Sequence, residues 1–401
     1  MARVSEKQTH IVVSTMNRIA YVTTYDASDV LNWSGLGFYI SQALLNQGLD
    51  VDFIGRLANP YSFHSLMTGS KKAFYRYLLR KNYLRDRDPA LLRGYARTVA
   101  KRLQGSSSDW VFCPGTIPVS YLECKQPIAF WTDVTFAGII DFYKSYAGNL
   151  CSETLQQGHA MEQSILDRCR LAIYASDWAA QTAIDSYGAM PEKVEVVPFG
   201  ANIECDRTPD DISQIVAERT QKVCRLLFIG VDWERKGGDI AYKVTKQLRE
   251  SGLDTELTVV GCQPVIDESP EPHFVKHIGF IKKSTPEGRA RLNKLLAESH
   301  FLILPSQAEC LGVVFCEASS FGLPSIATNV GGISAAVRNG KNGYTFDLNA
   351  EISEYCQKIL YLFNNYDVYQ ALSESSFEEY QTRLNWQVAG QKVKQLILER
   401  S

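Results

Sequence analysis

The chain has 401 residues, of which 45% are hydrophobic and 21% are charged, and its formal net charge is −2. This length exceeds one ordinary hydrophobic core, so two domains are expected. The near-neutral charge argues against a nucleic-acid binder, which usually carries a strongly basic domain. The opening MARVSEKQTH is polar, and no apolar run approaches the roughly 20 residues that cross a bilayer. We therefore expect a cytoplasmic protein with no nucleic-acid partner.

The residues that commonly bind metals are not arranged as a metal site. The ten cysteines are scattered, and none forms a Cys-x-x-Cys pair. Asp50 and Asp52 form the Asp-x-Asp motif of metal-dependent transferases. However, they lie inside an expected strand, and no further cluster of oxygen ligands accompanies them. We expect mostly buried, reduced thiols, no metal and no cofactor.

The N-terminal half alternates expected strands with helical segments. A helix is expected over residues 37–46, and short apolar runs bounded by turn residues predict strands at 18–25, 49–55, 109–115, 127–133, 171–176 and 194–198. Strands separated by helices predict a parallel sheet that is covered on both faces.

The second half repeats this alternation. Helices are expected at 238–251 and from Ser284 onward, with strands at 224–230, 255–261, 275–281, 301–306 and 325–330. Residues 201–222 lack the rhythm and are assigned to the linker. The fold class is therefore α/β, with two Rossmann-like, doubly wound domains facing each other across a cleft and ligands at the carboxyl ends of the strands.

The segment from Ser70 to Leu103 differs from the rest of the chain. It carries eleven lysines and arginines interleaved with aromatic and aliphatic residues, and Asp86 and Asp88 alone oppose them. A basic amphipathic helix of this kind can lie on an anionic membrane surface. It can equally be a solvated helical face that packs against the N-terminal sheet, so both interpretations stay open.

Two carboxylates flank an expected helix start in residues 304–332. Glu309 lies in the loop after a strand, and Glu317 follows about one and a half turns into the helix that begins near Gly312. Free backbone amides at a helix start form an anion site, and glycine leaves them open to a phosphate. A ligand held at its middle would then present hydroxyl groups to both carboxylates.

A second loop adds positive charge to the same edge of the sheet. Arg235 and Lys236 follow an expected strand, precede two glycines and lead into a helix. A diphosphate leaving group gains negative charge as a glycosidic bond breaks, and cations that stabilise this charge accelerate the reaction.

These residues resemble glycosyltransferase family 4, the large retaining family with the GT-B architecture. The resemblance covers most of the chain and is most specific in Glu-x-x-Gly-x-x-x-x-Glu-Ala, which starts at Glu309, with Gly-x-Pro at 322–324 and Gly-Gly at 331–332 behind it. It implies that Glu309 contacts the donor sugar, that Glu317 contacts the ribose, and that the backbone around Gly312 and Val313 holds the diphosphate with Lys236.

At one position the sequence departs from the family. Many members have arginine directly after the strand glycine, where this chain has Val231. Either Arg235 replaces that arginine or the arginine of the phosphate clamp is missing. By position in the family, Ile281 is a further candidate to contact the nucleotide base.

The N-terminal half supplies candidates for the acceptor side. Ser34 and Gly35 lie in a glycine-bearing loop that would close over the donor phosphates, or this loop is a simple strand-to-helix turn. Asp133 in WTDVTF either orients and deprotonates the acceptor or caps a helix. His159, read as part of a Gly-His-Ala turn before a helix, faces the acceptor or the surface. WTDVTF, GHAMEQSIL and ASDWAAQTAIDSYG are also similar to signatures of a bacterial subset of the family.

The resemblance implies a metal-independent hexosyltransferase that uses a nucleotide diphosphate sugar, with UDP-sugars favoured, and a saccharide or lipid-linked acceptor. We expect an acceptor domain over residues 1–200, a donor domain over 201–380 and a final helical segment, 381–401, that packs back on the first domain. A nucleotide-sugar epimerase and a catalytically silent nucleotide-binding scaffold remain alternatives.

Overall fold

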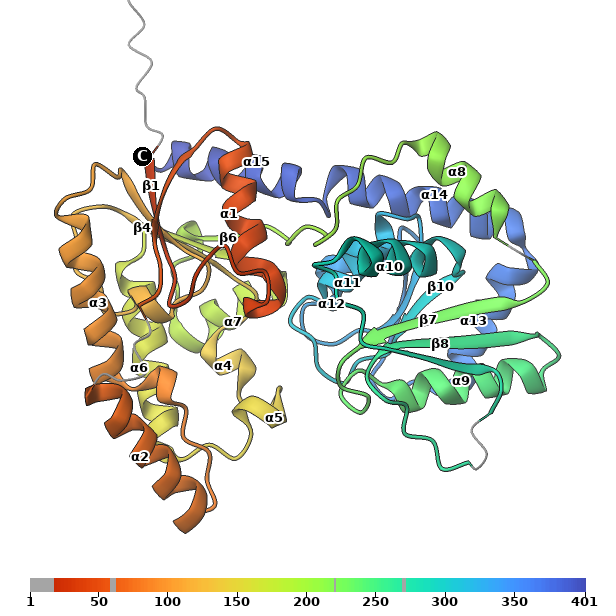
Figure 1. The fold of residues 1–401 in the computed structure, drawn as a ribbon, viewed down its shortest axis with the longest axis horizontal. Coiled ribbons are helices and arrows are strands. Elements are labelled where there is room, and N and C mark those ends of the chain that lie inside the picture. Colours follow the sequence, from red (N-terminus) through yellow and green to blue (C-terminus); the bar gives the residue numbers. More distant parts are fainter. Residues whose placement is uncertain (1–17, 58–62, 220, 269–271) are drawn as a thin grey trace, which may run out of the picture.

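The computed structural model describes residues 18–57, 63–219, 221–268 and 272–401. They form two α/β domains that lie side by side, joined by a linker and by the last helix (Figure 1). Each domain is built on a six-stranded sheet in which all strands are parallel. The expected fold class, two Rossmann-like domains, is therefore confirmed.

The N-terminal sheet has the strand order β2-β1-β3-β4-β5-β6. Its strands are β1 (Arg18–Val22), β2 (Asp50–Ile54), β3 (Trp110–Cys113), β4 (Ile128–Thr132), β5 (Leu171–Tyr174) and β6 (Val194–Val196). Its helices are α1 (Leu36–Asn46), α2 (Phe63–Leu78), α3 (Pro89–Leu103), α4 (Phe136–Ile139), α5 (Lys144–Ala147), α6 (Ser152–Arg168) and α7 (Asp177–Tyr187). The central strands β3, β4 and β5 are buried along their whole length because helices cover both faces.

The C-terminal sheet has the strand order β12-β11-β10-β7-β8-β9. Its strands are β7 (Cys224–Gly230), β8 (Thr255–Gly261), β9 (Val275–Gly279), β10 (Phe301–Leu304), β11 (Ser325–Thr328) and β12 (Gly343–Phe346). Its helices are α9 (Gly238–Glu250), α10 (Pro286–Glu298), α11 (Val313–Ser319), α12 (Ile333–Ala336), α13 (Ile352–Asn364) and α14 (Tyr366–Thr382). The edge strand β12 and the helices α13 and α14 were not predicted.

The linker is shorter than the sequence indicated. Residues 201–222 contain the helix α8 (Pro209–Glu218), which Thr208 caps and which packs against α14 and α10 of the C-terminal domain. The cap and the proline at the first helical turn are local signals that the sequence analysis did not use.

The last helix, α15 (Trp386–Glu399), returns to the N-terminal domain and lies along α1 (Figure 1). The ring of Trp386 stacks on Tyr39, with 6.1 Å between centroids, and its indole donates to Asn202 at 3.0 Å. Asn202 in turn donates to the backbone oxygen of Ser34 at 2.9 Å. The last helix, the linker and the loop after β1 are therefore connected by aromatic and polar contacts.

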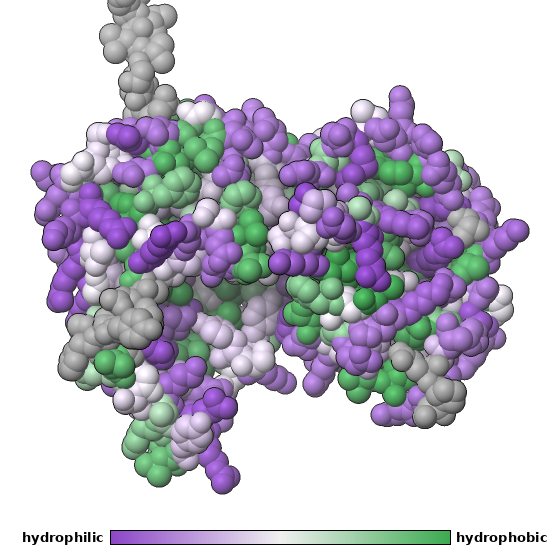
Figure 2. Space-filling view, in the orientation of Figure 1, coloured by the Kyte–Doolittle hydropathy of each residue, from purple (hydrophilic) through white to green (hydrophobic). Residues whose placement is uncertain are grey.

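The basic segment from Ser70 to Leu103 is two helices rather than one. α2 and α3 are separated by a turn whose last residue, Asp88, caps α3 and receives hydrogen bonds from Ala90 and Leu91. α2 extends away from the body of the domain, and apolar and charged surfaces lie next to each other at its end (Figures 1 and 2). Within the described ranges, no helix combines the length and the apolar character needed to span a bilayer.

Candidate active site

The topology of the C-terminal sheet brings the predicted cations and carboxylate together. β7 pairs with β8 on one side and with β10 on the other, so the chain order reverses between β7 and β10. Ligands of doubly wound sheets bind at such a switch point, outside the carboxyl ends of the strands. Arg235 and Lys236 follow β7, and Glu309 follows β10.

The loop after β7 can approach β10 because Gly237 has no side chain. A Cβ atom there would lie 1.9 Å from the backbone oxygen of Pro305, and the residue has φ = +75°. Both the close contact and the left-handed backbone require glycine.

Glu309 is the centre of the cluster. Its side chain is 10% exposed, and its Oε2 atom forms an ion pair with the Nζ atom of Lys236. The guanidinium of Arg235 lies 3.7 Å from the same oxygen. Val231 stands at the position where many family members carry arginine, and it is 71% exposed. In this chain the arginine beside the Glu309 carboxylate is Arg235.

Tyr143, which is not among the residues predicted from the sequence, reaches Glu309 from the other domain. Its hydroxyl donates to Oε1 of Glu309 at 3.1 Å and accepts the backbone N–H of Cys310 at 3.1 Å. Its ring also lies under the guanidinium of Arg235, 4.8 Å from the centroid. No motif marks Tyr143, because it comes eleven residues after the end of β4, in the short irregular stretch between α4 and α5.

Two more glycines bring the domains into contact beside Glu309. A Cβ atom on Gly331 would lie 2.7 Å from the ring of Phe142, and one on Gly332 would lie 2.8 Å from Oγ of Ser176. Residues after β4 and β5 of one sheet therefore meet residues after β10 and β11 of the other. The carboxyl ends of the two sheets face each other.

The helix start expected near Gly312 is present. Gly312 is the N-cap of α11 with φ = +82°, and Val313 is the first residue of the helix. A Cβ atom on Gly312 would lie 3.1 Å from Cγ of Glu309, so the glycine keeps the loop compact around the carboxylate.

Glu317 is buried on α11 and has a partner that the sequence analysis did not name. The Nζ atom of Lys283 lies 2.6 Å from each of its carboxylate oxygens. Ile281, two residues earlier, is buried after β9. Lys283 thus places a cation where the resemblance implies the ribose.

Asp133 follows β4 and does not cap a helix. The N-cap of α4 is Thr135, whose hydroxyl accepts the N–H of Gly138 at 3.0 Å, so that alternative is excluded. Burial, with a smaller contribution from the charge of Glu309, raises the pKa of Asp133 to about 7. The carboxyl is therefore close to half-protonated near neutral pH.

His159 is not in a turn. It lies inside α6, where its Nδ1 atom is 3.0 Å from the hydroxyl of Tyr187 and its ring meets Phe136 edge to face at 5.2 Å. Gly158 favoured a turn in the sequence, but here it leaves space for Phe136, whose ring would be 2.1 Å from a Cβ atom.

The loop after β1 has an unusual backbone. Trp33, Ser34 and Gly35 all have positive φ angles, of 47°, 54° and 84°. This conformation is strained for the two residues that carry side chains, and the contact between Asn202 and Ser34 described above helps to hold it. The backbone conformation of this loop therefore differs from that of a simple strand-to-helix turn.

The remaining candidates have structural partners. Asp50 pairs with Arg18 at 3.0 Å, and Asp52 accepts from Ser106 at 3.1 Å. Cys310, one of the ten cysteines expected to be mostly buried, is buried, and burial raises the pKa of its thiol well above the usual value. Across the described part of the chain, no three His, Cys, Asp or Glu residues gather as a metal site.

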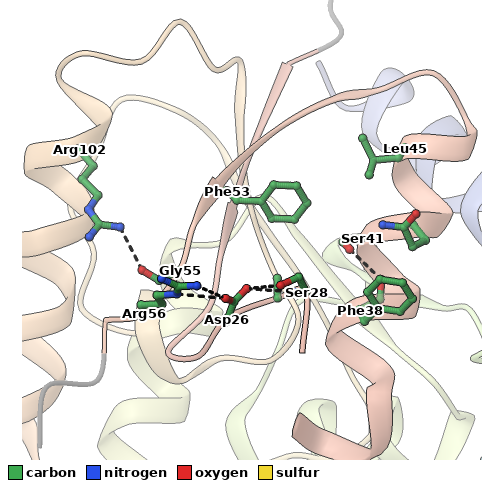
Figure 3. Close-up of a pocket in the computed structure, with 11 residues that line it drawn as sticks. Asp26, Ser28, Phe38, Ser41, Leu45, Phe53, Gly55, Arg56 and Arg102 are labelled. Atoms are coloured by element: carbon green, nitrogen blue, oxygen red, sulfur yellow. Dashed lines mark hydrogen bonds and ion pairs between the residues drawn. The ribbon is translucent and has the colours of Figure 1, made fainter. Parts of the chain in front are cut away.

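A separate pocket of about 580 Å³ opens in the N-terminal domain between α1, the loop after β1 and the edge strand β2 (Figure 3). Phe53 and Leu45 give it apolar walls, while Arg56 pairs with Asp26 through Nε at 3.0 Å. None of the residues that line it belongs to the Glu309 cluster. We place the active site at the cluster, because charges from both domains converge there.

Comparison with protein families supports the same assignment for the second domain. Residues 224–365, which run from the start of β7 to the end of α13, match the family model described as "Glycosyl transferases group 1". The C-terminal domain is a group 1 glycosyltransferase domain. The matched segment contains Lys236, Glu309 and Glu317, so the match supports the expected resemblance to family 4.

Relatives of this glycosyltransferase domain are known among both sequences and structures. The D-inositol 3-phosphate glycosyltransferase of Gordonia bronchialis is 26% identical over 45% of this chain and 42% of its own length. The chain thus matches less than half the length of this curated relative. A sucrose-phosphate synthase from Thermosynechococcus elongatus has a TM-score of 0.64 at 15% identity, covering 96% of this chain and 98% of its own. Anabaena HepE in complex with UDP-glucose has a TM-score of 0.60 at 16% identity, covering 95% and 99%. These two similarities show the GT-B fold.

Proposed function

We propose that the protein is a retaining hexosyltransferase that uses a nucleotide diphosphate sugar. UDP-sugars such as UDP-glucose are the favoured donors, and the acceptor is a hydroxyl of a saccharide or lipid-linked molecule in polysaccharide or glycolipid synthesis. The observation that carries the proposal is the cluster of Lys236, Arg235 and Glu309 at the switch point, faced by Asp133 and Tyr143. The UDP-glucose complex named above supports the choice of donor.

The cluster is suited to a ligand with a diphosphate and a sugar. Lys236 and Arg235 both engage the Glu309 carboxylate. A diphosphate carries more negative charge than one carboxylate, so it would attract both cations and leave Glu309 to accept hydrogen bonds from sugar hydroxyls. Glu317, with Lys283, would bind the ribose at the other end.

The same cations would stabilise the transition state. Negative charge grows on the leaving diphosphate as the glycosidic bond breaks, and preorganised cations in a half-buried site stabilise that charge more than the ground state. Two cations and the amides around Gly312 supply this stabilisation in our mechanism without a metal. In a front-face attack, the departing phosphate helps to deprotonate the acceptor and the configuration is retained.

In this mechanism Asp133 would meet the acceptor. It comes from the N-terminal domain, the charge of Glu309 raises its pKa, and its own charge raises the pKa of Tyr143. Its raised pKa lets it accept or donate a hydrogen bond near neutral pH, so it would orient the acceptor hydroxyl.

A donor-and-acceptor assay tests the proposal. Purified protein is incubated with UDP-, GDP- and ADP-sugars, alone and with a panel of saccharide and lipid-linked acceptors. Nucleotide release that depends on the acceptor, with an unchanged anomeric configuration by NMR, is the expected result. An isomer formed from the donor alone would indicate an epimerase. Nucleotide binding with no release under any condition would indicate a silent scaffold.

We also propose that α2 places the protein on an anionic membrane, at the inner face, with a lipid-linked acceptor. Leu66, Met67, Phe74, Tyr77 and Leu78 are all exposed and lie within about one third of the helix circumference at 100° per residue. At the same spacing, Lys72 and Arg76 lie on the other faces of the helix, with Lys72 opposite the centre of this apolar strip. A helix with apolar residues on one face and cations on the polar face is typical of helices that bind membrane surfaces.

Co-sedimentation with phosphatidylserine vesicles at low and high salt tests this proposal. Binding should be weaker at high salt, since screening reduces attraction between exposed charges. Phe74→Ser with Tyr77→Ser should reduce binding, whereas Arg97→Gln on α3 serves as a control that removes a charge away from the strip. Equal binding by the double variant and the wild type would contradict it.

A further inference from the structure

Segments that are far apart in the sequence converge on one aromatic side chain. Phe136, in WTDVTF, is the first residue of α4 and is buried. Around its ring lie Gly158 of GHAMEQSIL, where a Cβ atom would be 2.1 Å from the ring, His159 at 5.2 Å and the guanidinium of Arg87 at 5.5 Å. Phe136 is therefore enclosed by α6 and by the turn before α3.

The backbone at the start of α4 is held by side chains from two other helices. The N–H of Ala137 donates to the hydroxyl of Tyr187, on α7, at 2.9 Å. The N–H of Phe136 is close enough to the carboxyl of Glu162, on α6, to lower the pKa of that carboxyl. A helix start leaves its first amides without partners inside the helix, so these contacts fix α4 from outside.

Glu162 is buried with few partners. It is 2% exposed, its Oε2 atom accepts a long hydrogen bond of 3.4 Å from Thr116, and its Oε1 atom has no protein partner among the described residues. Burial raises its pKa to about 7, although the buried Arg87 lowers it. A buried carboxyl with such incomplete pairing costs stability, which indicates a role other than stabilising the fold.

The segment that these groups hold carries both N-terminal residues of the proposed active site. Asp133 precedes α4 by three residues, and Tyr143 follows its end by four. Between them, Phe142 packs against Trp178 of α7, with 4.9 Å between centroids. A shift of α4 would therefore move Asp133 and the hydroxyl of Tyr143 away from Glu309 together.

We propose that Glu162 and Tyr187 are positioning residues that hold the segment from Asp133 to Tyr143 against Glu309. They act through Phe136 and Ala137 and do not touch the donor or the acceptor. This inference rests on the proposed function for its kinetic consequence, while the placement of Tyr143 can be measured without any activity.

The kinetic test compares Tyr187→Phe and Glu162→Leu with the wild type. A displacement of about 1 Å in a reacting group can cost about 100-fold in rate. We expect kcat to fall by about 10-fold to 100-fold, while the affinity for UDP, which the C-terminal domain would bind, stays unchanged by calorimetry. Glu162→Gln keeps an oxygen for the Phe136 N–H, so its kcat should stay near the wild-type value. Tyr121→Phe, a hydroxyl removal elsewhere in the same domain, is the matched control.

Fluorine NMR of protein labelled with 3-fluorotyrosine supplies the readout that is independent of activity. The Tyr143 signal is assigned by its loss in Tyr143→Phe. It should shift or broaden in Tyr187→Phe and Glu162→Leu, and stay in place in Glu162→Gln and Tyr121→Phe. If Glu162→Leu does not fold, Tyr187→Phe alone carries the test.

The outcomes separate the two proposals. A shifted Tyr143 signal in a protein that transfers no sugar would reject the proposed function and retain the positioning role. Unchanged Tyr143 signals in folded variants would overturn the positioning role, as would equal losses of kcat and UDP affinity or a Glu162→Gln variant as damaged as Glu162→Leu.

Discussion

The hydroxyl of Tyr143, in the N-terminal domain, donates a 3.1 Å hydrogen bond to the carboxylate of Glu309, in the C-terminal domain. The same hydroxyl accepts the N–H of Cys310, so it contacts both the side chain and the loop that the motif assigns to the donor. A sugar hydroxyl has the same donor and acceptor capacity as this phenol. Tyr143 thus marks the place where sugar hydroxyls are expected to bind.

Tyr143→Phe should loosen the Cys310 loop without removing the aromatic ring from Arg235. One lost hydrogen bond is worth about 1 kcal/mol, which corresponds to amide exchange about fivefold faster. Hydrogen exchange of a peptide that contains Cys310 measures this. Exchange at the wild-type rate would show that the hydroxyl contact contributes nothing to the closed arrangement.

Lys236→Ala should abolish most of the donor affinity, because Lys236 is the half-buried ammonium at the switch point. Loss of one charge-assisted contact costs about 1.5–3 kcal/mol, or roughly 10-fold to 150-fold in Kd. Calorimetry with UDP measures the change. Lys243→Ala, on the exposed face of α9, is the control and should bind UDP like the wild type. Unchanged affinity in Lys236→Ala would refute the assignment.

Glu309→Gln should lower turnover far more than nucleotide affinity. It frees Lys236 and Arg235 from their carboxylate partner, so UDP should bind as tightly as before or more tightly. Removal of one such group typically costs about 100-fold or more in kcat. Steady-state kinetics and calorimetry on the same preparation separate the two effects, and a normal kcat would remove Glu309 from catalysis.

Asp133→Asn should stabilise the protein more at pH 8 than at pH 5. The folded-state pKa of Asp133 is raised to about 7, so the native state holds a proton that the unfolded chain has released. The carboxyl therefore lowers stability as the pH rises from about 4 to about 7. We expect a gain of about 1–2 kcal/mol at pH 8, discounted because the side chain is only half-buried.

Thermal melts of Asp133→Asn at the two pH values measure this difference. Asp185→Asn, which removes an exposed carboxylate on α7, is the matched control and should show none. Equal shifts of Tm for Asp133→Asn at pH 5 and pH 8 would mean that Asp133 titrates normally.

The sequence predicted most elements whose local signals are strong. β7 and β8 have the predicted bounds, and α9 begins at the predicted Gly238, because each of these strands is a short segment rich in apolar and β-branched residues that ends at a glycine. It missed β12, an edge strand of only four residues, three of them half-buried, which does not show this pattern. His159 was misplaced because Gly158 indicates a turn locally, whereas its role is to accommodate the ring of Phe136.

The sequence by itself determined the donor half of the candidate site, since Lys236, Glu309, Gly312 and Glu317 lie in short motifs next to strand ends. Only the tertiary structure brought in Tyr143, Lys283 and the Glu162–Tyr187 support. Each of these contacts joins two residues that are separated by between 34 and 166 positions in the sequence. Spacing along the chain does not predict such contacts. They form only when one domain packs on the other and when α6 and α7 pack on α4.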